Sequence, residues 1–178
     1  MNLPIQSGYV TLRCWVPSDS DQLVEEADSR VVWRNLTHHF PSPYAQRDAD
    51  SWIARCIGQE PARDLVITHH GRLVGVCGIE IGEGVNAYTG EIGYWLGDAH
   101  WGQGIASSAF ALFLTYVWDT FDVERLEARV FAWNPASARV LEKNGFVLEG
   151  TRRKAIHKDG EFVDERLYSL LRGEAGAP

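Results

Sequence analysis

A pair of glycines around one glutamine, Gly102-Gln103-Gly104, limits which folds this chain can adopt. The pair lies between an extended aromatic segment and a long apolar one. Glycine weakens helices and adds nothing to a core, so this turn needs either an unusual backbone conformation or close approach by another molecule. The first N–H groups of a helix lack partners inside it, and the helix dipole adds positive partial charge there. The turn therefore predicts a phosphate-binding helix start, with a tight turn made for geometry alone as the alternative.

The segments around this turn predict a mixed α/β protein, because short alternating runs are interleaved with runs of helical spacing. Residues 29–45 are aromatic and irregular, with two prolines. The expected strands are 9–16, 65–68, 73–81, 91–96, 126–133, 146–150 and 162–170, and the expected helices are 21–27, 46–58, 105–121 and 135–144, with a turn at 158–160.

Length, charge and cysteine content narrow the class of protein. A chain of 178 residues suits one domain with a full-sized core. The net charge of -7 argues against nucleic-acid binding through phosphates. Three cysteines, Cys14, Cys56 and Cys77, have no metal-like spacing, which predicts buried free thiols and no metal site. With no apolar run of membrane-spanning length, we expect a cytoplasmic protein without a membrane partner.

The glycine turn differs from two common nucleotide-binding motifs. A P-loop has a lysine directly after its second glycine, and this chain has Ile105 there. A dinucleotide fingerprint has a third glycine, and Ser107 stands at that position. Neither motif explains the turn.

Four ordered motifs resemble those of the GCN5-related N-acetyltransferases, and more closely the Rim branch, which acetylates N-terminal residues of ribosomal proteins. They are Tyr94-Trp95-Leu96, the turn at 101–106, Asn134-Pro135-Ala136-Ser137 and Asn144-Gly145-Phe146, within a resemblance over residues 8–171. The resemblance implies a mixed α/β (α+β) fold, with a twisted sheet of about seven strands, about four helices and a splayed strand pair that holds the cofactor. It also implies a single domain over 1–172 and a flexible tail over 173–178.

The same resemblance implies acetyl-coenzyme A as cofactor, with its pyrophosphate on the turn and its pantetheine arm along the strand before it. Asn134 would bond to the pantetheine, although it equally suits a plain helix N-cap. Arg139 and Lys143 would meet the 3′-phosphate, although exposed helix charges are commonly only solvated. The implied cofactor residues are Tyr94, Trp95, Leu96, Trp101, Gly102, Gln103, Gly104, Ile105, Ala106, Ser107, Asn134, Ser137, Arg139 and Lys143.

Acetyl transfer to an amine needs a neutral nitrogen, a stabilised oxyanion and a proton for the thiolate. A backbone N–H near Trp95 or Leu96 is the expected oxyanion donor. Glu91 is the first candidate for the base and Glu80 the second. Each of the two glutamates also suits a solvent-facing carboxylate on a strand.

The proton donor to the thiolate departs from the common family pattern. Many members have a tyrosine seven residues after the asparagine, where this chain has Leu141. The Rim branch has a serine three residues after the asparagine, and Ser137 matches it. The Rim branch also has a glutamate where this chain has Ile156, which leaves the base and the ribosomal substrate open.

The acceptor pocket is expected to involve Trp33, Phe40, Tyr44 and Trp95, and the first three of these aromatics lie in the irregular segment. A protein N-terminal amine is the favoured acceptor, since its reference pKa of ~8 lies well below that of lysine. Two alternatives stay open: an acetyltransferase for a small amine such as a polyamine or aminoglycoside, and a degenerate sensor that binds acyl-coenzyme A without turnover. A homodimer also stays open.

Overall fold

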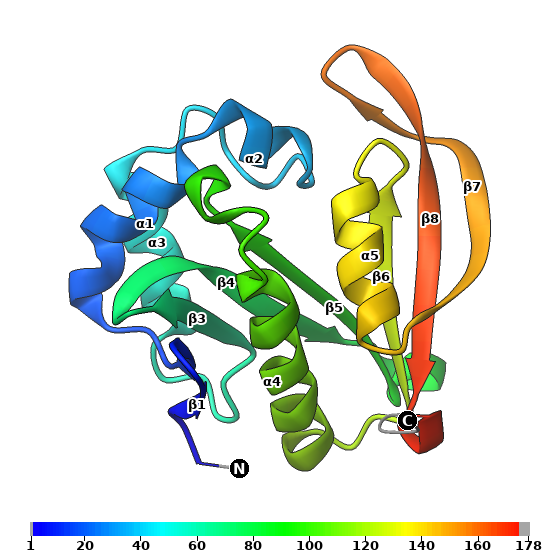
Figure 1. The fold of residues 1–178 in the computed structure, drawn as a ribbon, viewed down its shortest axis with the longest axis horizontal. Helices are drawn as coiled ribbons and strands as arrows, with labels where there is room; N and C mark the ends of the chain where they lie inside the picture. The colour runs from blue at the N-terminus through cyan, green and yellow to red at the C-terminus, as the bar shows by residue number, and fades with distance from the viewer. Residues whose placement is uncertain (1, 175–178) are drawn as a thin grey trace. The chain divides into compact units, whose positions relative to one another are not determined.

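The computed structural model describes residues 2–174. Within these residues, eight strands pair in the order β1-β2-β3-β4-β5-β6-β8-β7, and the chain can be followed by colour in Figure 1. The strands are β1 (Ile5–Ser7), β2 (Val10–Arg13), β3 (Asp64–His69), β4 (Arg72–Ile81), β5 (Thr89–Leu96), β6 (Arg125–Phe131), β7 (Val147–Lys158) and β8 (Glu161–Leu171). The α-helices are α1 (Ser20–Ala27), α2 (Arg30–Arg34), α3 (Gln46–Cys56), α4 (Ile105–Thr120) and α5 (Pro135–Lys143), and the short 3-10 helices include η1 (Pro17–Asp19), η2 (Gly84–Asn86), η3 (Asp98–His100) and η4 (Arg172–Glu174).

The mixed α/β fold class is confirmed, with one strand and one helix more than expected. The additional elements are β1, which has three residues, and α2, which has five. The β7–β8 hairpin is also longer than expected, because β7 continues to Lys158. The predicted turn between them is present, with Asp159 and Gly160 both at positive φ (54° and 78°).

The chain divides into two compact units, each built from two stretches of sequence. The first unit contains the residues up to Gly78 together with 94–116, and the second contains 79–93 together with the residues from Val117 onward. Strands β4 and β5 and helix α4 contribute residues to both units. The expectation of a single domain over 1–172 stays a prediction.

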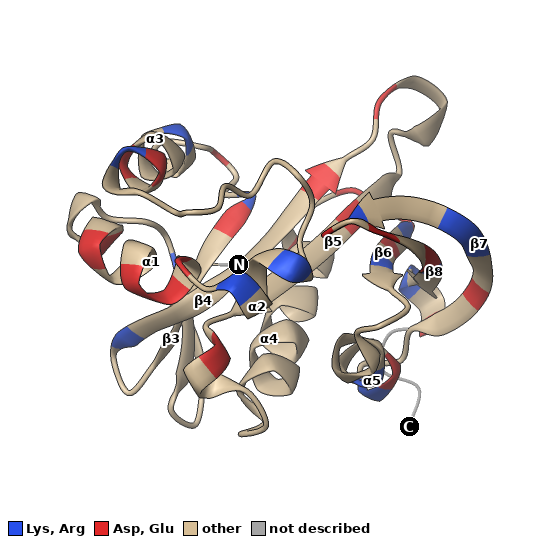
Figure 2. Cartoon of the chain, turned by 90° about the horizontal axis from the view of Figure 1, so that it is seen from above, with Lys and Arg blue, Asp and Glu red and all other residues tan. Residues whose placement is uncertain are grey.

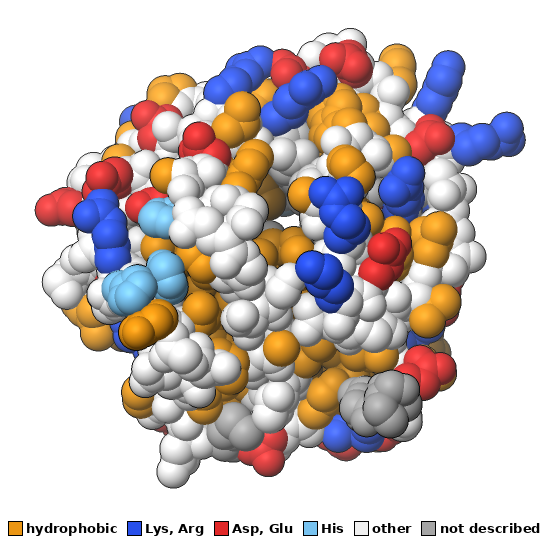
Figure 3. Space-filling model, in the orientation of Figure 1, with side chains coloured by type: hydrophobic (Ala, Val, Ile, Leu, Met, Phe, Trp, Pro, Cys, Tyr) orange, Lys and Arg blue, Asp and Glu red, His pale blue; other side chains and the backbone are white. Residues whose placement is uncertain are grey.

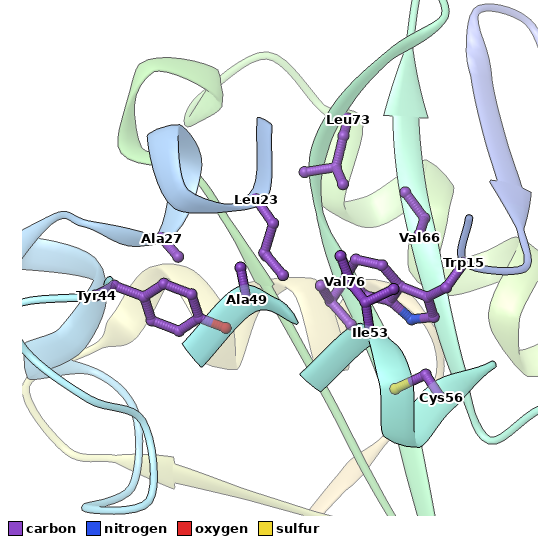
Figure 4. Packing of buried hydrophobic residues seen from close by; sticks show 10 residues of the cluster. All are labelled: Trp15, Leu23, Ala27, Tyr44, Ala49, Ile53, Cys56, Val66, Leu73 and Val76. Carbon is purple, nitrogen blue, oxygen red and sulfur yellow. The ribbon is translucent and has the colours of Figure 1, made fainter. Parts of the chain in front are cut away.

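The first unit is built on a hydrophobic cluster between its helices and strands, shown in Figure 4. Helix α3 contributes Ala49, Ile53 and Cys56, whose spacing places them on one helix face. Burial of apolar surface stabilises such a core by about 25 cal/mol per Å². Two large side chains, Phe40 and Trp95, pack against the cluster while only partly buried. The cluster consists of Trp15, Leu23, Ala27, Tyr44, Ala49, Ile53, Cys56, Val66, Leu73 and Val76.

The second unit contains a parallel strand pair that is very short. β5 pairs with β6 over 89–91, and the last partners are Glu91 and Glu127. β6 goes on to Phe131 and pairs with β8 along its whole length. Beyond residue 91, therefore, β5 has no paired residue on β6 within the described part of the chain, as expected of a splayed pair.

The β7–β8 hairpin, orange to red in Figure 1, ends the sheet order with β7 at the edge. Its register shifts between Arg152 and Ile156, so the strand bulges there. Lys154 within this bulge has a φ of 51°. Its backbone N–H donates to Oδ1 of Asp164 on β8 at 2.7 Å, which holds the bulge in place.

Several expectations concern chemistry outside the site. All three cysteines are free, but Cys14 is exposed, so the prediction of three buried thiols is wrong for it; it lies where β2 ends. In residues 2–174, no helix is long and apolar enough to span a membrane, and no group of three or more potential ligands is placed to hold a metal. Of the expected tail, residues 173–174 belong to η4 and 175–178 lie outside the described residues.

Candidate functional site

The turn between β5 and α4 has the geometry that its glycines allow. Gly102 and Gly104 have φ values of 74° and 79°, a region that strains any residue with a Cβ. No heavy atom lies within 4 Å of where a Cβ would stand at either glycine. The glycines therefore serve the backbone geometry, and their side-chain positions face open space.

Two side chains brace this turn from within the first unit. The indole Nε1–H of Trp101 donates to the carbonyl of Leu96 at 3.0 Å. The amide Nε2 of Gln103 donates to the carbonyl of Ala99, also at 3.0 Å. Both polar side-chain groups are thus committed to backbone carbonyls, so what the turn offers a ligand is its own backbone.

The backbone N–H groups at 102–107 are available to a ligand. Ser108 is the first residue here whose N–H reaches a helical acceptor, the carbonyl of Gly104 at 3.1 Å. Among residues 2–174, the six N–H groups before it donate to no protein acceptor. Unpaired donors at a helix start, together with the helix dipole, fit an anion such as a diphosphate.

Gly75 on β4 allows the end of β5 to pack closely against β4. A Cβ at Gly75 would stand 2.1 Å from the carbonyl oxygen of Trp95, so only glycine permits this approach. The next residue along β5, Leu96, is buried. The backbone at 95–96, where an oxyanion donor is expected, is therefore fixed by packing.

The structure brings three of the four predicted acceptor aromatics together in the first unit. The ring of Phe40 lies 5.4 Å from that of Trp95, edge to face, and 5.0 Å from that of Tyr44. Tyr44 is only 6% exposed and belongs to the core cluster, and burial raises its pKa to about 12. Trp33 lies on α2, with the Arg30 guanidinium 4.5 Å from its ring centre. Of the three aromatics that meet, Phe40 and Trp95 retain accessible surface.

Asn134 and Ser137 meet at the start of α5, in the second unit. The Asn134 Oδ1 accepts the Ser137 backbone N–H at 3.1 Å, so Asn134 is the N-cap that its residue type suggests. This bond occupies the carbonyl oxygen and leaves the Nδ2 group as a donor. Both side chains are half-buried. The cap and a ligand-binding role are therefore compatible.

Arg139 and Lys143 are both exposed on α5, one turn apart. Neither forms an ion pair with another residue in the described range 2–174. They remain able to meet a phosphate, and their role stays a prediction.

Glu91 lies in the second unit beside Arg129, with 3.3 Å between carboxylate oxygen and guanidinium nitrogen. The Glu91 side chain is 47% exposed, and its partial burial raises its pKa; the Arg129 charge opposes the rise, and the charges of Glu80, Glu127 and Glu165 add to it. A raised carboxyl pKa suits a general base, which works best near ambient pH. Glu80 is exposed and contributes to this cluster by its charge.

Sequence reasoning missed three residues behind the turn: Glu26, Arg72 and His100. Glu26 is 8% exposed, and its carboxylate lies 3.2 Å from Nε2 of His100. These residues are far apart in sequence, and nothing local distinguishes Glu26 from its exposed neighbour Glu25. Only the folded structure reveals the contact.

Comparisons with known proteins agree with this geometry. A family model described as "Acetyltransferase (GNAT) domain" matches residues 10–147. The chain is 32% identical to the uncharacterized N-acetyltransferase p20 of Bacillus licheniformis, over 93% of this chain and 94% of that protein. It is 33% identical to the ribosomal-protein-serine acetyltransferase of Escherichia coli, over 62% and 61% of the two chains. Mycobacterium smegmatis RimJ, solved with a coenzyme A disulfide, superposes with a TM-score of 0.81 at 25% identity, covering 94% of this chain and 84% of that one.

Proposed function

The chain belongs to the GNAT acetyltransferase family and is an acyltransferase, and on that premise we propose that it moves the acetyl group of acetyl-coenzyme A to a primary amine. The favoured acceptor is a protein N-terminal amine. The observation that carries the cofactor assignment is the run of six backbone N–H groups at 102–107 without a protein acceptor. A diphosphate supplies the oxygens that such donors require.

In this proposal the remaining cofactor contacts come from β5 and α5. The backbone of β5 at Tyr94, Trp95 and Leu96 binds the pantetheine arm, and the Nδ2 group of Asn134 donates to it. Arg139 and Lys143 attract the 3′-phosphate. The cofactor, when bound, supplies the activated acetyl thioester.

Residues of this chain then transfer protons and stabilise the charge that develops during the reaction. Glu91 accepts the proton of the acceptor ammonium, directly or through water, which leaves the nitrogen neutral for attack. A backbone N–H at 95–96 stabilises the oxyanion. The Ser137 hydroxyl hydrogen-bonds to the departing sulfur and relays a proton to it. Glu80 reinforces Glu91 through its charge.

The protein N-terminal acceptor is supported by the E. coli relative, whose name describes a ribosomal-protein-serine acetyltransferase. In such a site Phe40 and Trp95 contact the first side chain of the acceptor. A small polyamine or aminoglycoside is the second candidate, because Glu80, Glu91 and Glu127 form an acidic group that attracts cations. We place the protein in the cytoplasm, where free thiols persist, with no nucleic-acid partner and with a homodimer left open.

The test is thiol release from acetyl-coenzyme A with N-terminal peptides of ribosomal proteins, polyamines and aminoglycosides, alongside calorimetric binding of coenzyme A. Peptide-dependent release supports the favoured acceptor, and release with only small amines selects the second candidate. Binding without release with any acceptor favours the sensor. Absence of coenzyme A binding contradicts the assignment of the turn.

A further inference from the structure

Behind the glycine turn, the first unit contains a buried acidic group that the reaction described above does not use. Glu26 lies in the last turn of α1 and is 8% exposed. Figure 2 shows red segments on α1, and among the acidic residues of this helix Glu26 is the buried one. A carboxylate near a helix C-terminus is unfavourable, because the dipole end there is negative. A buried one requires compensating partners.

Two basic side chains provide that compensation. His100, the last residue of η3, places Nε2 3.2 Å from the Glu26 carboxylate. Arg72, at the start of β4, places Nε at 3.8 Å from it. Histidine side chains gather in one area of the surface in Figure 3. Burial lowers the pKa of His69, and the charges of His70 and His100 lower it further. Glu25 also pairs with Arg72 but is 63% exposed.

The Glu26 carboxylate also lies close to the backbone at Gly97, just before the turn. A Cβ at Gly97 would stand 1.9 Å from Oε2 of Glu26, so only glycine leaves room for this side chain. Gly97 itself donates its N–H to the carbonyl of Val74 at 2.9 Å. Glu26 thus touches residue 97 and residue 100, the two ends of the segment that leads into the free N–H groups at 102–107.

We propose that Glu26 is a positioning residue for coenzyme A: through His100 and Gly97 it fixes the segment 97–100, and so aims the N–H groups of the turn at the pyrophosphate. The proposal rests on the proposed cofactor site. It predicts that Glu26 and His100 act as one unit, because the contact between their side chains is lost when either one is replaced.

The test measures coenzyme A affinity by calorimetry in Glu26→Gln, His100→Ala and the double variant. We expect each single change to weaken binding about tenfold, the scale of one charge-assisted hydrogen bond, and the double variant to be no weaker than either single one. His100→Gln, whose amide nitrogen reaches the place of Nε2, should recover most of the affinity lost in His100→Ala. Glu25→Gln is the matched control, because it removes a neighbouring carboxylate that shares Arg72 but does not touch the turn.

The melting temperature of each free variant separates positioning from general destabilisation. A lower melting temperature with unchanged affinity overturns the proposal, as does equal weakening in Glu25→Gln or additive losses in the double variant. If Glu26→Gln does not fold, the His100→Ala and His100→Gln pair decides the question alone. Wild-type protein that does not bind coenzyme A contradicts the proposed function itself, which is a different result from an unaffected variant.

Discussion

At the residue scale, Gly104 combines a positive φ with open space beside the free N–H groups. We expect Gly104→Val to abolish coenzyme A binding, because its branched side chain fills the space that the pyrophosphate needs. The same change strains the backbone by about 1–2 kcal/mol. Calorimetric titration with coenzyme A checks the prediction.

Gly160 provides the control for that strain. Its φ of 78° matches the 79° of Gly104, and it too has no heavy atom within 4 Å of an added Cβ, but it lies in the β7–β8 turn. Gly160→Val should therefore lose similar stability and keep its coenzyme affinity. Equal affinity in the two variants would remove the turn from the binding site.

Ser137 is expected to act on the departing sulfur, since its backbone N–H already belongs to the Asn134 cap. Ser137→Ala should lower kcat about a hundredfold, the lower range for a lost general acid, with nearly unchanged coenzyme affinity. Ser137→Thr keeps a hydroxyl and should retain more activity. Steady-state thiol release gives kcat, and equal rates in wild type and Ser137→Ala would exclude the hydroxyl from the reaction.

With Glu91 as the general base, kcat/KM is expected to rise with pH. Burial raises its pKa and Arg129 partly offsets that rise, so the base form gains population as pH increases through the shifted pKa. Removing the opposing charge in Arg129→Ala should raise the pKa further and move the rising limb of kcat/KM to higher pH. Glu91→Gln should slow the reaction and remove that limb. If kcat/KM rises with pH in Glu91→Gln as it does in the wild type, another residue is the base.

At the element scale, β7 is joined to β6 across β8 by a carboxylate. Glu149 accepts a hydrogen bond from Arg125 Nη1 at 2.8 Å and another from Ser169 Oγ at 2.7 Å. Arg125 and Ser169 together lower the pKa of Glu149 from 4.5 to about 2. Because the folded-state pKa is depressed, the stabilisation is present above pH 4.5 and is lost as pH falls through about 2.

Glu149→Gln should accordingly flatten the acid limb of the stability curve between pH 4.5 and 2. Urea unfolding at a series of pH values measures the free energy of unfolding of both proteins. Glu83→Gln, which changes an exposed carboxylate on the chain before η2, is the control and should leave the limb unchanged. If the free energy of unfolding falls as steeply with decreasing pH in Glu149→Gln as in the wild type, the role assigned to Glu149 is contradicted.

Elements with strong local signals were predicted well, and those defined by tertiary contacts were not. The glycine turn, the Asn134-Pro135 helix start and the alternation in β6 are all local, and the structure confirms each of these elements. α2 was missed because five residues leave no helical period, although Ser29 caps it. The second half of β7 was missed because its bulge breaks the alternation that identifies strands.

The same distinction applies to the candidate site. Gly102 and Gly104 could be identified from spacing, because their conformational demand is local. The contact of Glu26 with His100 joins residues 74 positions apart, and no pattern in one sequence predicts it. The pairing of Glu91 with Arg129 likewise depends on which strands become neighbours.

At the scale of the whole molecule, β4, β5 and α4 pass through both compact units, and each unit uses two separate stretches of chain. Neither unit can lose its structure without breaking elements of the other, so we expect a single cooperative unfolding transition. In a Trp118→Phe/Trp133→Phe variant, the remaining tryptophans all lie in the first unit and report on it alone. Their fluorescence and the far-UV circular dichroism of the chain should give coincident urea transitions, whereas two separated midpoints would contradict this.

The bulge in β7 also bears on the behaviour of the protein in a concentrated solution. β7 closes the strand order, so its outer row of backbone groups is an open template for a strand of another molecule. Arg152, Arg153 and Lys154 are exposed at the bulge, where the register breaks. Like charges and an interrupted ladder repel and misalign an incoming strand, which protects the longest hairpin of the molecule against edge-to-edge aggregation. Two copies that associate would do so more readily through another surface.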